Sequence, residues 1–464
     1  MAATRLKDAS TAATRGPDEI WPAFLAAHPD TREVDLVLPD LSGIGRGKRM
    51  EVRAFAGGLD AGFCFPTTLY ALDSTGANVD RTGLVWEEGD ADRPCFADLA
   101  TLRTVPWRPG GAQVLGGMCE EDGRPFFADP RAVLQGVADR LAELGLTPCA
   151  ALELEFYLVQ PGLDADGTPR PPIDPGTGAP GADVQVYSME RLDAQDTFLT
   201  ELRAFAEAQG LPVKDTLAEY APGQYEVNLG HVADPLRAAD DAFLFKRTVK
   251  AAARRAGLLA TFMAKPFTEQ SGSGLHIHLS LLDREGRNIF AGADGEARLL
   301  HAIGGLRAAL PESMLLFAPN ANSFRRFRPG SYAPMAPTWG HNNRTVALRV
   351  PRSGPGARRV EHRVAGADAN PYLALAAVLA GVHHGLTDQL DPGPAVTGNA
   401  YIKVPPSLPR SWDRAIDAFG RGRILPDYLG ADFCRVYRLC REAERERFHD
   451  VIQPVEYAWY LRHV

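Results

Sequence analysis

The chain has 464 residues, of which 45% are hydrophobic and 23% charged, and its formal net charge is −8. This is the composition of a globular protein, and the acidic balance disfavours nucleic acid or an anionic membrane as a partner. Because a chain of this length exceeds one ordinary hydrophobic core, we expect two domains, one small and one large.

Nothing in the sequence predicts export or membrane insertion. The opening stretch, "MAATRLKDASTAATRGPDEI", lacks the apolar segment of a signal peptide. No apolar run approaches the roughly 18 residues of a transmembrane helix. The six cysteines form no CxxC pair, which is typical of reduced thiols. We therefore expect a cytoplasmic protein.

The N-terminal part is rich in predicted strands and turns. We expect a flexible arm over residues 1–20 and a small β-rich domain over 21–128. The elements predicted here are a short helix at 19–30, a hairpin around a Gly-rich turn at 31–52, and further strands and turns at 99–130.

The second predicted domain covers residues 129–464 and begins at an Asp-Pro pair. Its first elements are a helix at 130–145, with proline at its start and glycine at its end, a strand at 147–159, and a Pro- and Gly-dense loop or lid at 161–184. Helices and strands then alternate, and the chain from about residue 371 is mainly helical. This order predicts an α/β or α+β layout.

The strand predicted at 147–159 contains "AALELEFYL", an apolar run with two glutamates. Because side chains alternate between the faces of a strand, Glu153 and Glu155 share one face, opposite a row of leucines. Adjacent carboxylates repel each other and resist desolvation, and a divalent cation between them removes both costs. The alternative is a solvated face with basic partners elsewhere.

Three further segments repeat this pattern of polar side chains on an apolar strand. They are "LAEYAPGQYEVNLG" with Glu219 and Glu226, "GSGLHIHLSL" with His276, His278 and Ser280, and "ARRVEHRVAG" with Arg359, Glu361 and Arg363. Carboxylates with an imidazole suit Mg²⁺ or Mn²⁺, and arginines suit carboxylate or phosphate groups. Metal and arginines together are what phosphoryl transfer needs. Since no GxxxxGK[ST] loop is present, we expect an ATP site of another kind.

These segments, together with "TFMAKP", "NSFRRFRPG" and "HNNRTVALRVP", resemble type I glutamine synthetases over nearly the whole chain. The resemblance implies an α+β fold with a small N-terminal β-grasp-like domain and a large catalytic domain, whose curved antiparallel sheet is flanked by helices. It implies a homo-oligomer, a dodecamer of two stacked hexamers with active sites between subunits. The implied reaction transfers a phosphoryl group from ATP to the γ-carboxylate of glutamate, after which an amine nitrogen displaces phosphate to form an amide.

The resemblance also implies two Mg²⁺ or Mn²⁺ ions per active site, with ATP as co-substrate. The ligands implied for the ion on the glutamate side are Glu155, Glu219 and Glu226. Those implied for the ion that bridges the ATP phosphates are Glu153, His276 and Glu361.

Further roles follow from the same resemblance. The residues expected to contact the nucleotide are His278, Ser280 and Arg359. Those expected to grip phosphate and stabilise its transfer are Arg344 and Arg349, together with Arg359. Those expected to hold glutamate are Arg326 and Arg363, beside the loop glycine Gly272. Arginine forks bind carboxylates and phosphates through two parallel hydrogen bonds, which suits these roles.

Departures from the family pattern bear on the nitrogen donor. Ammonia-using members carry a flap glutamate and an N-terminal aspartate that bind and deprotonate ammonium, and this chain has Tyr332 and Pro66 at those positions. Ser271 replaces a loop asparagine. Losing both acids favours a bulkier amine over ammonia.

The variant patterns "PGSYAP…TWGHNNRTVALR", "QVYS" and "LPDLSGIGRGKR" resemble γ-glutamylputrescine synthetases of polyamine catabolism. We therefore expect glutamate to be joined to putrescine or another small amine. The candidates for removing the amine proton are Tyr332, Glu219 and the phosphate. Trp339 either walls the amine pocket through a cation–π contact or packs in the core.

Two alternative functions stay open at this point. One is an ammonia-using glutamine synthetase, against which Tyr332 and Pro66 speak. The other is a non-catalytic relative that binds ligands, which is disfavoured because all six implied metal ligands are present.

Overall fold

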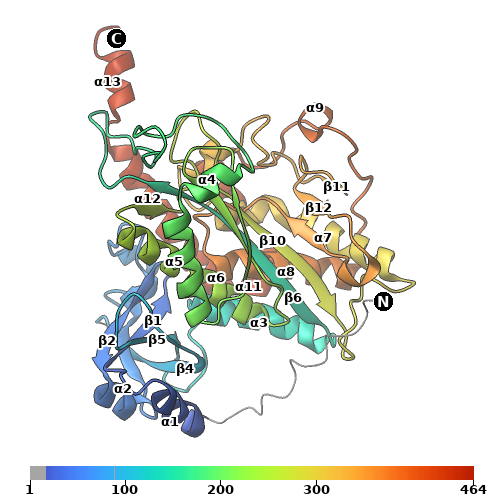
Figure 1. Ribbon diagram of the computed structural model, residues 1–464. Helices are drawn as coiled ribbons and strands as arrows, with labels where there is room; N and C mark the ends of the chain where they lie inside the picture. Colours follow the sequence, from blue (N-terminus) through green and yellow to red (C-terminus); the bar gives the residue numbers. More distant parts are fainter. Residues whose placement is uncertain (1–16, 88) are drawn as a thin grey trace, which may run out of the picture.

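The computed structural model describes residues 17–87 and 89–464, which form an α+β structure (Figure 1). Most of the arm predicted for residues 1–20 lies outside the described residues. Its last part is not an arm, because helix α1 (Pro17–Ala27) already begins there. Trp21 of this helix is buried against Phe55, with ring centroids 5.0 Å apart, and this contact holds α1 on the small N-terminal unit.

The N-terminal unit is built on a five-stranded sheet with the order β2-β1-β5-β4-β3. Its strands are β1 (Glu33–Pro39), β2 (Gly45–Glu51), β3 (Phe63–Pro66), β4 (Asp92–Thr104) and β5 (Gly111–Met118). The short helices are α2 (Val52–Gly58), η1 (Thr67–Tyr70) and η2 (Asp80–Thr82). Strands β1 and β2 pair antiparallel, so the predicted hairpin is confirmed, whereas β1 and β5 run parallel.

The larger unit contains an eight-stranded sheet with the order β11-β12-β13-β10-β6-β8-β7, and β9 pairs with β6. The strands are β6 (Thr147–Val159), β7 (Val213–Ala218), β8 (Gln224–Leu229), β9 (Leu259–Thr261), β10 (Leu275–Leu282), β11 (Trp339–His341), β12 (Leu348–Val350) and β13 (Val360–His362). All pairs are antiparallel except β11 with β12. The expected α+β class with an antiparallel-rich sheet is confirmed, and β6 has the predicted bounds.

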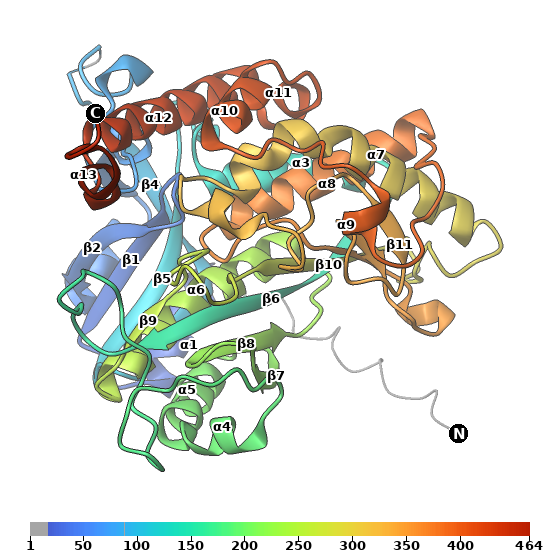
Figure 2. The same cartoon turned by 90° about the horizontal axis from the view of Figure 1, so that it is seen from above.

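Helices cover one face of this sheet, the face on which the leucines of β6 lie (Figure 2). The longer helices are α3 (Pro130–Glu143), α5 (Asp196–Ala208), α6 (Pro235–Arg255), α7 (Gly295–Phe317), α8 (Pro371–Asp388), α10 (Trp412–Gly420) and α12 (Ala431–Asp450). The shorter ones are α4 (Met189–Asp193), η3 (Ser323–Arg326), η4 (Pro355–Ala357), α9 (Ala400–Lys403), α11 (Ile424–Leu429) and α13 (Pro454–Tyr460). The helical end predicted from residue 371 is confirmed.

Helix α7 is not among the predicted elements. It contains Pro311 and a pair of glycines, which lower helix propensity and obscure the pattern. The glycines have a packing reason, because a Cβ added at Gly305 would lie 2.1 Å from the carbonyl oxygen of Gly381 on α8. The two helices therefore approach backbone to backbone beneath the sheet.

Two expectations drawn from composition can be compared with the structure. No helix among the described residues combines the length and the apolar character needed to cross a bilayer. All six cysteines are free, as expected for reduced thiols.

Buried ion pairs join the two units. Arg131 on α3 donates two hydrogen bonds of 2.9 Å to the carboxylate of Asp240 on α6 and one of 2.7 Å to Asp98 on β4. Asp240 also accepts a hydrogen bond of 2.7 Å from the Tyr372 hydroxyl. Because the Asp240 side chain is only 2% exposed, its charge depends on these partners.

Replacing this arginine should destabilise the protein markedly. We expect Arg131→Met to lower the free energy of unfolding by about 3–5 kcal/mol, because it leaves a buried carboxylate without its counter-charge. The matched control is Arg140→Met on the same helix, whose ion pair with Asp427 is solvent-exposed. That control should cost under about 1 kcal/mol. Thermal unfolding followed by circular dichroism compares the two, and equal shifts would contradict the prediction.

Candidate active site

Four adjacent strands place acids and histidines next to one another on the face that the helices leave open. The direct cross-strand neighbours are Glu226 and Glu155 on β8 and β6, Glu153 and His276 on β6 and β10, and His278 and Glu361 on β10 and β13. Such neighbours have Cβ atoms about 5 Å apart, so their side chains meet. The alternation predicted for β6 and β10 is confirmed, because the leucines between these residues are buried in the core.

Glu153 is the centre of this row. Its two carboxylate oxygens lie 3.0 Å from Nδ1 of His276 and 2.5 Å from Nε2 of His278. The Nε–H of Arg359 donates to Nδ1 of His278 over 3.0 Å, so the ring proton sits on Nε2 and is donated to Glu153. Burial alone would raise the pKa of Glu153, but the hydrogen bonds from both histidines hold it well below its usual range.

Among the described residues, the acids on the other side of Glu153 have no histidine hydrogen bond of this kind. Burial, added to the charges of Glu153 and Glu155, raises the pKa of Glu226 to about 9. Burial and the charge of Glu155 raise the pKa of Glu219 to about 7. Glu155 itself accepts a hydrogen bond of 2.9 Å from the backbone N–H of Gly274. The carboxylates therefore cannot all ionise at neutral pH unless a cation joins them.

Two groups of side chains offer ligand atoms that all lie within 4.8 Å of one another. They are Glu153 with Glu226 and His276, and Glu153 with His278 and Glu361. Carboxylate oxygens with imidazole nitrogen are a donor set that Mg²⁺ and Mn²⁺ accept. Both groups draw on the expected ligands together with His278, and the division of the six ligands between two ions stays a prediction. Glu226 lies with Glu153 and His276, because β6 and β8 are adjacent, and His278 joins Glu361 across the β10–β13 pair.

Arginines flank the row on the β12–β13 side. Arg349 donates to Glu361 over 2.7 Å and Arg363 also pairs with this carboxylate. Burial raises the pKa of Glu361, but the charge of Arg363 opposes this effect, and the net result is a lowered pKa. Among the described residues, the buried Nε–H groups of Arg349 and Arg363 find no acceptor. These donors are therefore free for an anionic ligand.

One cavity of about 450 Å³ joins these groups. The predicted site residues that line it are Glu153, Glu155, Glu219, Glu226, His276, Glu361, Arg344, Arg349, Arg363, Gly272 and Tyr332. Other lining residues were not predicted, notably Tyr187, Tyr220 and Asn228. Asn228 follows Glu226 at the strand period of two and could have been found from that spacing. The two tyrosines lie on turns, where no periodicity marks them.

Arg326 and Gly272 form one contact at the edge of the cavity. A Cβ added at Gly272 would lie 2.6 Å from Cγ of Arg326 and 2.8 Å from the carbonyl oxygen of Ala264, so only glycine fits there. Arg326 is buried and donates to the carbonyl oxygen of Val364 over 3.2 Å. It sits behind the lining residues, near Glu155, and its substrate role stays a prediction.

Five predicted residues are not among those that line the cavity, namely Arg326, His278, Arg359, Trp339 and Ser280. Trp339 belongs to the hydrophobic core, where its indole N–H donates to the carbonyl oxygen of Gly393 over 2.9 Å. Of the two roles expected for Trp339, a wall of the amine pocket or packing in the core, the structure shows packing. Ser280 lies two residues beyond His278 on β10, opposite Cys149, away from the acids.

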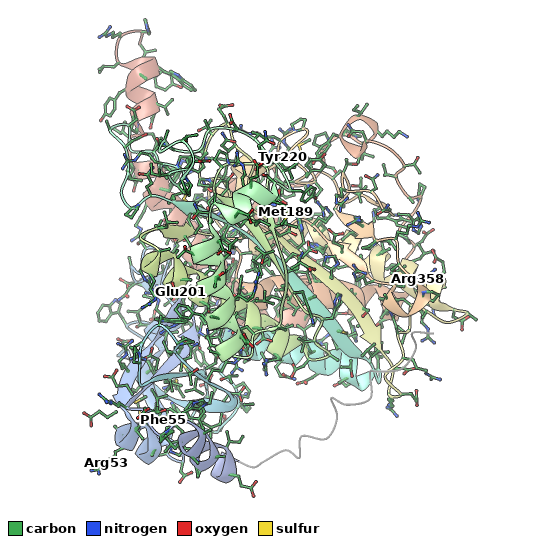
Figure 3. All side chains as sticks on the ribbon, in the orientation of Figure 1. Arg53, Phe55, Met189, Glu201, Tyr220 and Arg358 are labelled. Carbon is green, nitrogen blue, oxygen red and sulfur yellow. The ribbon has the colours of Figure 1, made fainter. Side chains whose placement is uncertain are left out.

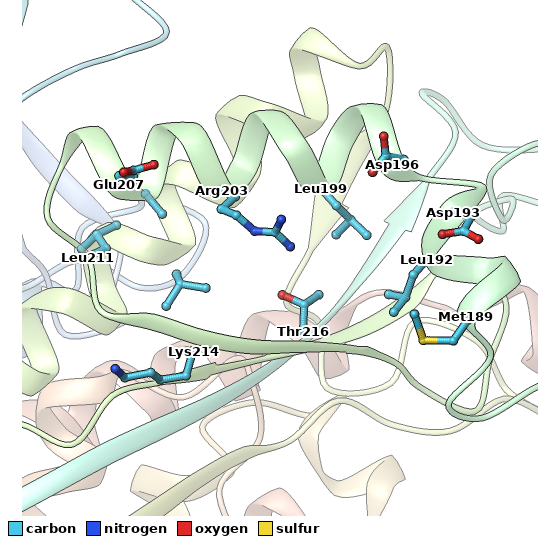
Figure 4. Close-up of a pocket in the computed structure, with 12 residues that line it drawn as sticks. Met189, Leu192, Asp193, Asp196, Leu199, Arg203, Glu207, Leu211, Lys214 and Thr216 are labelled. Atoms are coloured by element: carbon cyan, nitrogen blue, oxygen red, sulfur yellow. The ribbon is translucent and has the colours of Figure 1, made fainter.

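A second hollow, of about 490 Å³, lies between α4, α5 and the edge strand β7 (Figure 4). Its lining includes Leu199, Arg203 and Lys214, and none of the predicted site residues. The chemistry indicated by the acids, histidines and arginines therefore belongs to the smaller cavity.

The comparisons with known proteins agree with this geometry. A family model described as "Glutamine synthetase, catalytic domain" matches residues 127–460. The chain therefore belongs to the glutamine synthetase family.

Within that family its similarity to particular proteins can be stated. It is 41% identical over 442 residues to the gamma-glutamylputrescine synthetase PuuA of Escherichia coli (strain K12), covering 95% of this chain and 93% of that protein. It is 34% identical to the gamma-glutamylethanolamide synthetase GlnA4 of Streptomyces coelicolor, covering 96% of this chain and 95% of that protein. A solved structure titled "GmaS/ADP complex-Conformation 1" aligns with a TM-score of 0.83 and 28% identity, covering 95% of this chain and 98% of that one.

The raised pKa values predict a pH-dependent response to metal. Between the usual carboxyl pKa near 4.5 and the values of about 7 for Glu219 and about 9 for Glu226, the folded state binds more protons than the unfolded state. The stability of the metal-free protein should therefore fall as pH rises through this window. Mn²⁺ at a hundredfold excess over its dissociation constant adds about 2.7 kcal/mol.

This stabilisation should be larger near pH 8.5 than near pH 6, because the ion must displace protons at the lower pH. Melting temperatures with and without Mn²⁺ at the two pH values provide the measurement. Glu226→Gln should flatten the pH dependence of the metal-free protein, and the exposed Glu296→Gln should leave it unchanged. An equal shift at both pH values would contradict the assignment.

Proposed function

We propose that the protein is an ATP-dependent glutamate–amine ligase that joins the γ-carboxylate of glutamate to a primary amine, with putrescine as the leading substrate. The observation that carries the proposal is the single cavity in which a carboxylate–histidine row meets arginines with unsatisfied Nε–H groups. Family membership and the similarity to relatives named for amine ligation support the choice of reaction.

The residues fit two divalent ions, whose proposed ligands are Glu153, Glu155, Glu219, Glu226, His276 and Glu361. Bound Mg²⁺ or Mn²⁺ would supply polarisation and charge neutralisation of the transferred phosphoryl group. In the proposed site Arg344, Arg349 and Arg359 hold phosphate oxygens, and Arg326 and Arg363 hold the carboxylates of glutamate. The grip of Arg349 and Arg363 on Glu361 already fixes their guanidinium groups, so little side-chain freedom is lost when an anion binds.

The proposed reaction has two steps. The γ-carboxylate oxygen of glutamate takes the terminal phosphoryl group of ATP and ADP is released. The amine nitrogen then bonds to the carbonyl carbon of the γ-carboxyl group, the bond from that carbon to the phosphate oxygen breaks, and the extra proton of the nitrogen passes to a base. Glu219, Tyr332 and the departing phosphate are the candidates for this base. Glu219 and Tyr332 both line the cavity, where the amine has to enter.

The nitrogen donor is proposed to be larger than ammonia. An ammonium site needs acids that surround a small cation, and this chain carries Tyr332 and Pro66 where the family's ammonia-using members have such acids. The Tyr332 side chain is 45% exposed and offers an aromatic surface in the cavity. Such a surface packs against an alkyl chain, which a bare ammonium ion lacks.

An amine panel tests the proposal. Purified protein is supplied with ATP, glutamate, Mg²⁺ or Mn²⁺ and one of putrescine, ethanolamine, isopropylamine or ammonium, and phosphate release is followed with mass detection of the amide. We expect turnover with putrescine at a kcat/KM at least tenfold above that with ammonium. Arg363→Met should lose more than about a hundredfold in kcat/KM, because it removes both a substrate contact and the counter-charge of Glu361.

Two results would reject the proposal. Rapid turnover with ammonium and none with the alkylamines would identify an ammonia-using glutamine synthetase. Binding of ATP and metal without phosphate release on any acid and amine would identify a non-catalytic relative.

We further propose a homo-oligomer, a dodecamer of two stacked hexamers. Helix α13 stands clear of the rest of the chain (Figure 1). The large apolar side chains of its region are exposed, among them Trp459 at 64% and Leu461 at 72%. A second copy of the chain is the occupant that would cover this surface, because exposed apolar clusters of this kind mark interfaces.

Polar substitutions on α13 should weaken this assembly. We expect the double variant Trp459→Ser, Leu461→Ser to halve the mass of the assembly in native mass spectrometry while the subunit fold is kept. The matched control is Ile402→Ser on α9, which is 83% exposed and not part of the α13 region. An unchanged mass for the double variant would exclude α13 as the contact between rings.

A further inference from the structure

Three tyrosines gather at the mouth of the active-site cavity. Tyr187, Tyr220 and Tyr332, which we call the tyrosine cluster, all line it and are 62%, 39% and 45% exposed. The rings of Tyr220 and Tyr332 lie 6.3 Å apart between centroids at an angle of 27°. A hydrogen bond also joins these two side chains. The pair therefore presents one aromatic surface toward the cavity.

The backbone holds the cluster together from three separate segments. The N–H of Tyr187 donates to the carbonyl oxygen of Ala218 over 2.9 Å, which fixes the segment before α4 beside the end of β7. Tyr220, labelled in Figure 3, lies on the turn between β7 and β8. Tyr332 lies on the loop that follows η3.

Two members of the cluster have an unfavourable backbone conformation. The φ angles of Tyr187 and Tyr332 are +61° and +56°, in the left-handed region that bulky side chains rarely adopt. Such a conformation costs free energy and persists where the surrounding structure imposes it, most often at binding sites. Both rings are held at the cavity mouth despite this cost, which indicates a ligand-binding role.

The cavity changes character with depth. At its floor the Glu361 and Arg363 side chains are 1% and 6% exposed, whereas the rings of the cluster are at the rim. A nucleophilic nitrogen has to reach the floor, so the rim contacts the far end of the same substrate. Glu219, beside the cluster, is one of the proposed metal ligands, so its carboxylate is engaged in the proposed site. The ring faces are therefore the surface left for a second positive charge.

We propose that the tyrosine cluster binds the distal ammonium group of a diamine over its ring faces, while the other amine reaches the floor. This inference rests on the proposed ligase function and specifies its substrate class. A cation over an aromatic face within about 6 Å gains a contact that an uncharged methyl group does not. A monoamine of equal length loses that contact, and ammonium has no distal end to offer.

The test uses two substrates and two variants of Tyr220, the member of the cluster whose φ angle is not in the left-handed region. For the wild type, Tyr220→Phe and Tyr220→Leu, kcat/KM is measured with 1,4-diaminobutane and with n-butylamine, and the ratio of the two values is compared. Because both substrates report on the same variant, general damage to the enzyme cancels in the ratio. Melting temperature with Mn²⁺ and ADP verifies that each variant is folded and binds nucleotide.

We expect the wild type to prefer the diamine. Tyr220→Phe should keep this preference, and Tyr220→Leu should reduce it by about two- to thirtyfold, mainly through the KM of the diamine. Tyr187→Leu should act in the same direction.

Three outcomes decide the matter. No preference for the diamine in the wild type, or an unchanged ratio in both leucine variants, overturns the cluster as a diamine site and leaves the ligase function standing. The third outcome is tested with hydroxylamine, a nucleophile that is uncharged near neutral pH. If the wild type forms neither amide with any amine nor hydroxamate with hydroxylamine, the ligase function itself fails, and the inference fails with it.

Discussion

The constraint on which the site depends is the repulsion among carboxylates that one sheet face brings together. Strand pairing fixes Glu153, Glu155 and Glu226 close to one another, and their backbones cannot move apart without breaking the ladder of β8, β6 and β10. Histidine hydrogen bonds keep Glu153 ionised, whereas burial and neighbouring charge push Glu226 toward its neutral form. A divalent ion relieves this conflict at both places. The carboxylates that would hold this ion are the ones proposed to place it beside the transferred phosphoryl group.

The packing beneath the sheet keeps that constraint in place. The rows of leucine and isoleucine behind the acids are buried against α6 and the other helices of the covered face. Helices α7 and α8 meet through glycines and so leave little room for the layer to shift. A buried network around Arg131 fastens the N-terminal unit to the same layer. Floor, helices and N-terminal unit therefore form one connected support.

Much of the floor could be predicted because alternation in a strand places every second side chain on one face. The bounds of β6 and the shared face of Glu153 and Glu155 follow from "AALELEFYL" alone. Which of these side chains lie within reach of one another could not be predicted in this way, because it depends on which strand lies beside which and in what register. Trp339 illustrates another limit, since the sequence cannot tell an indole that walls a pocket from one that donates to a backbone carbonyl in the core. Tyr187 and Tyr220 were missed because turns have no period.

The site thus divides into a floor made from strands and a rim made from turns and loops. A substitution on the floor disturbs register, charge balance and packing together, whereas the turn that carries Tyr220 can exchange its side chain with little effect on the ladder behind it. A change of amine would then require substitutions at the rim alone and leave the ladder of strands undisturbed. The two relatives described above match 95% and 96% of this chain, and they are named for putrescine and for ethanolamide.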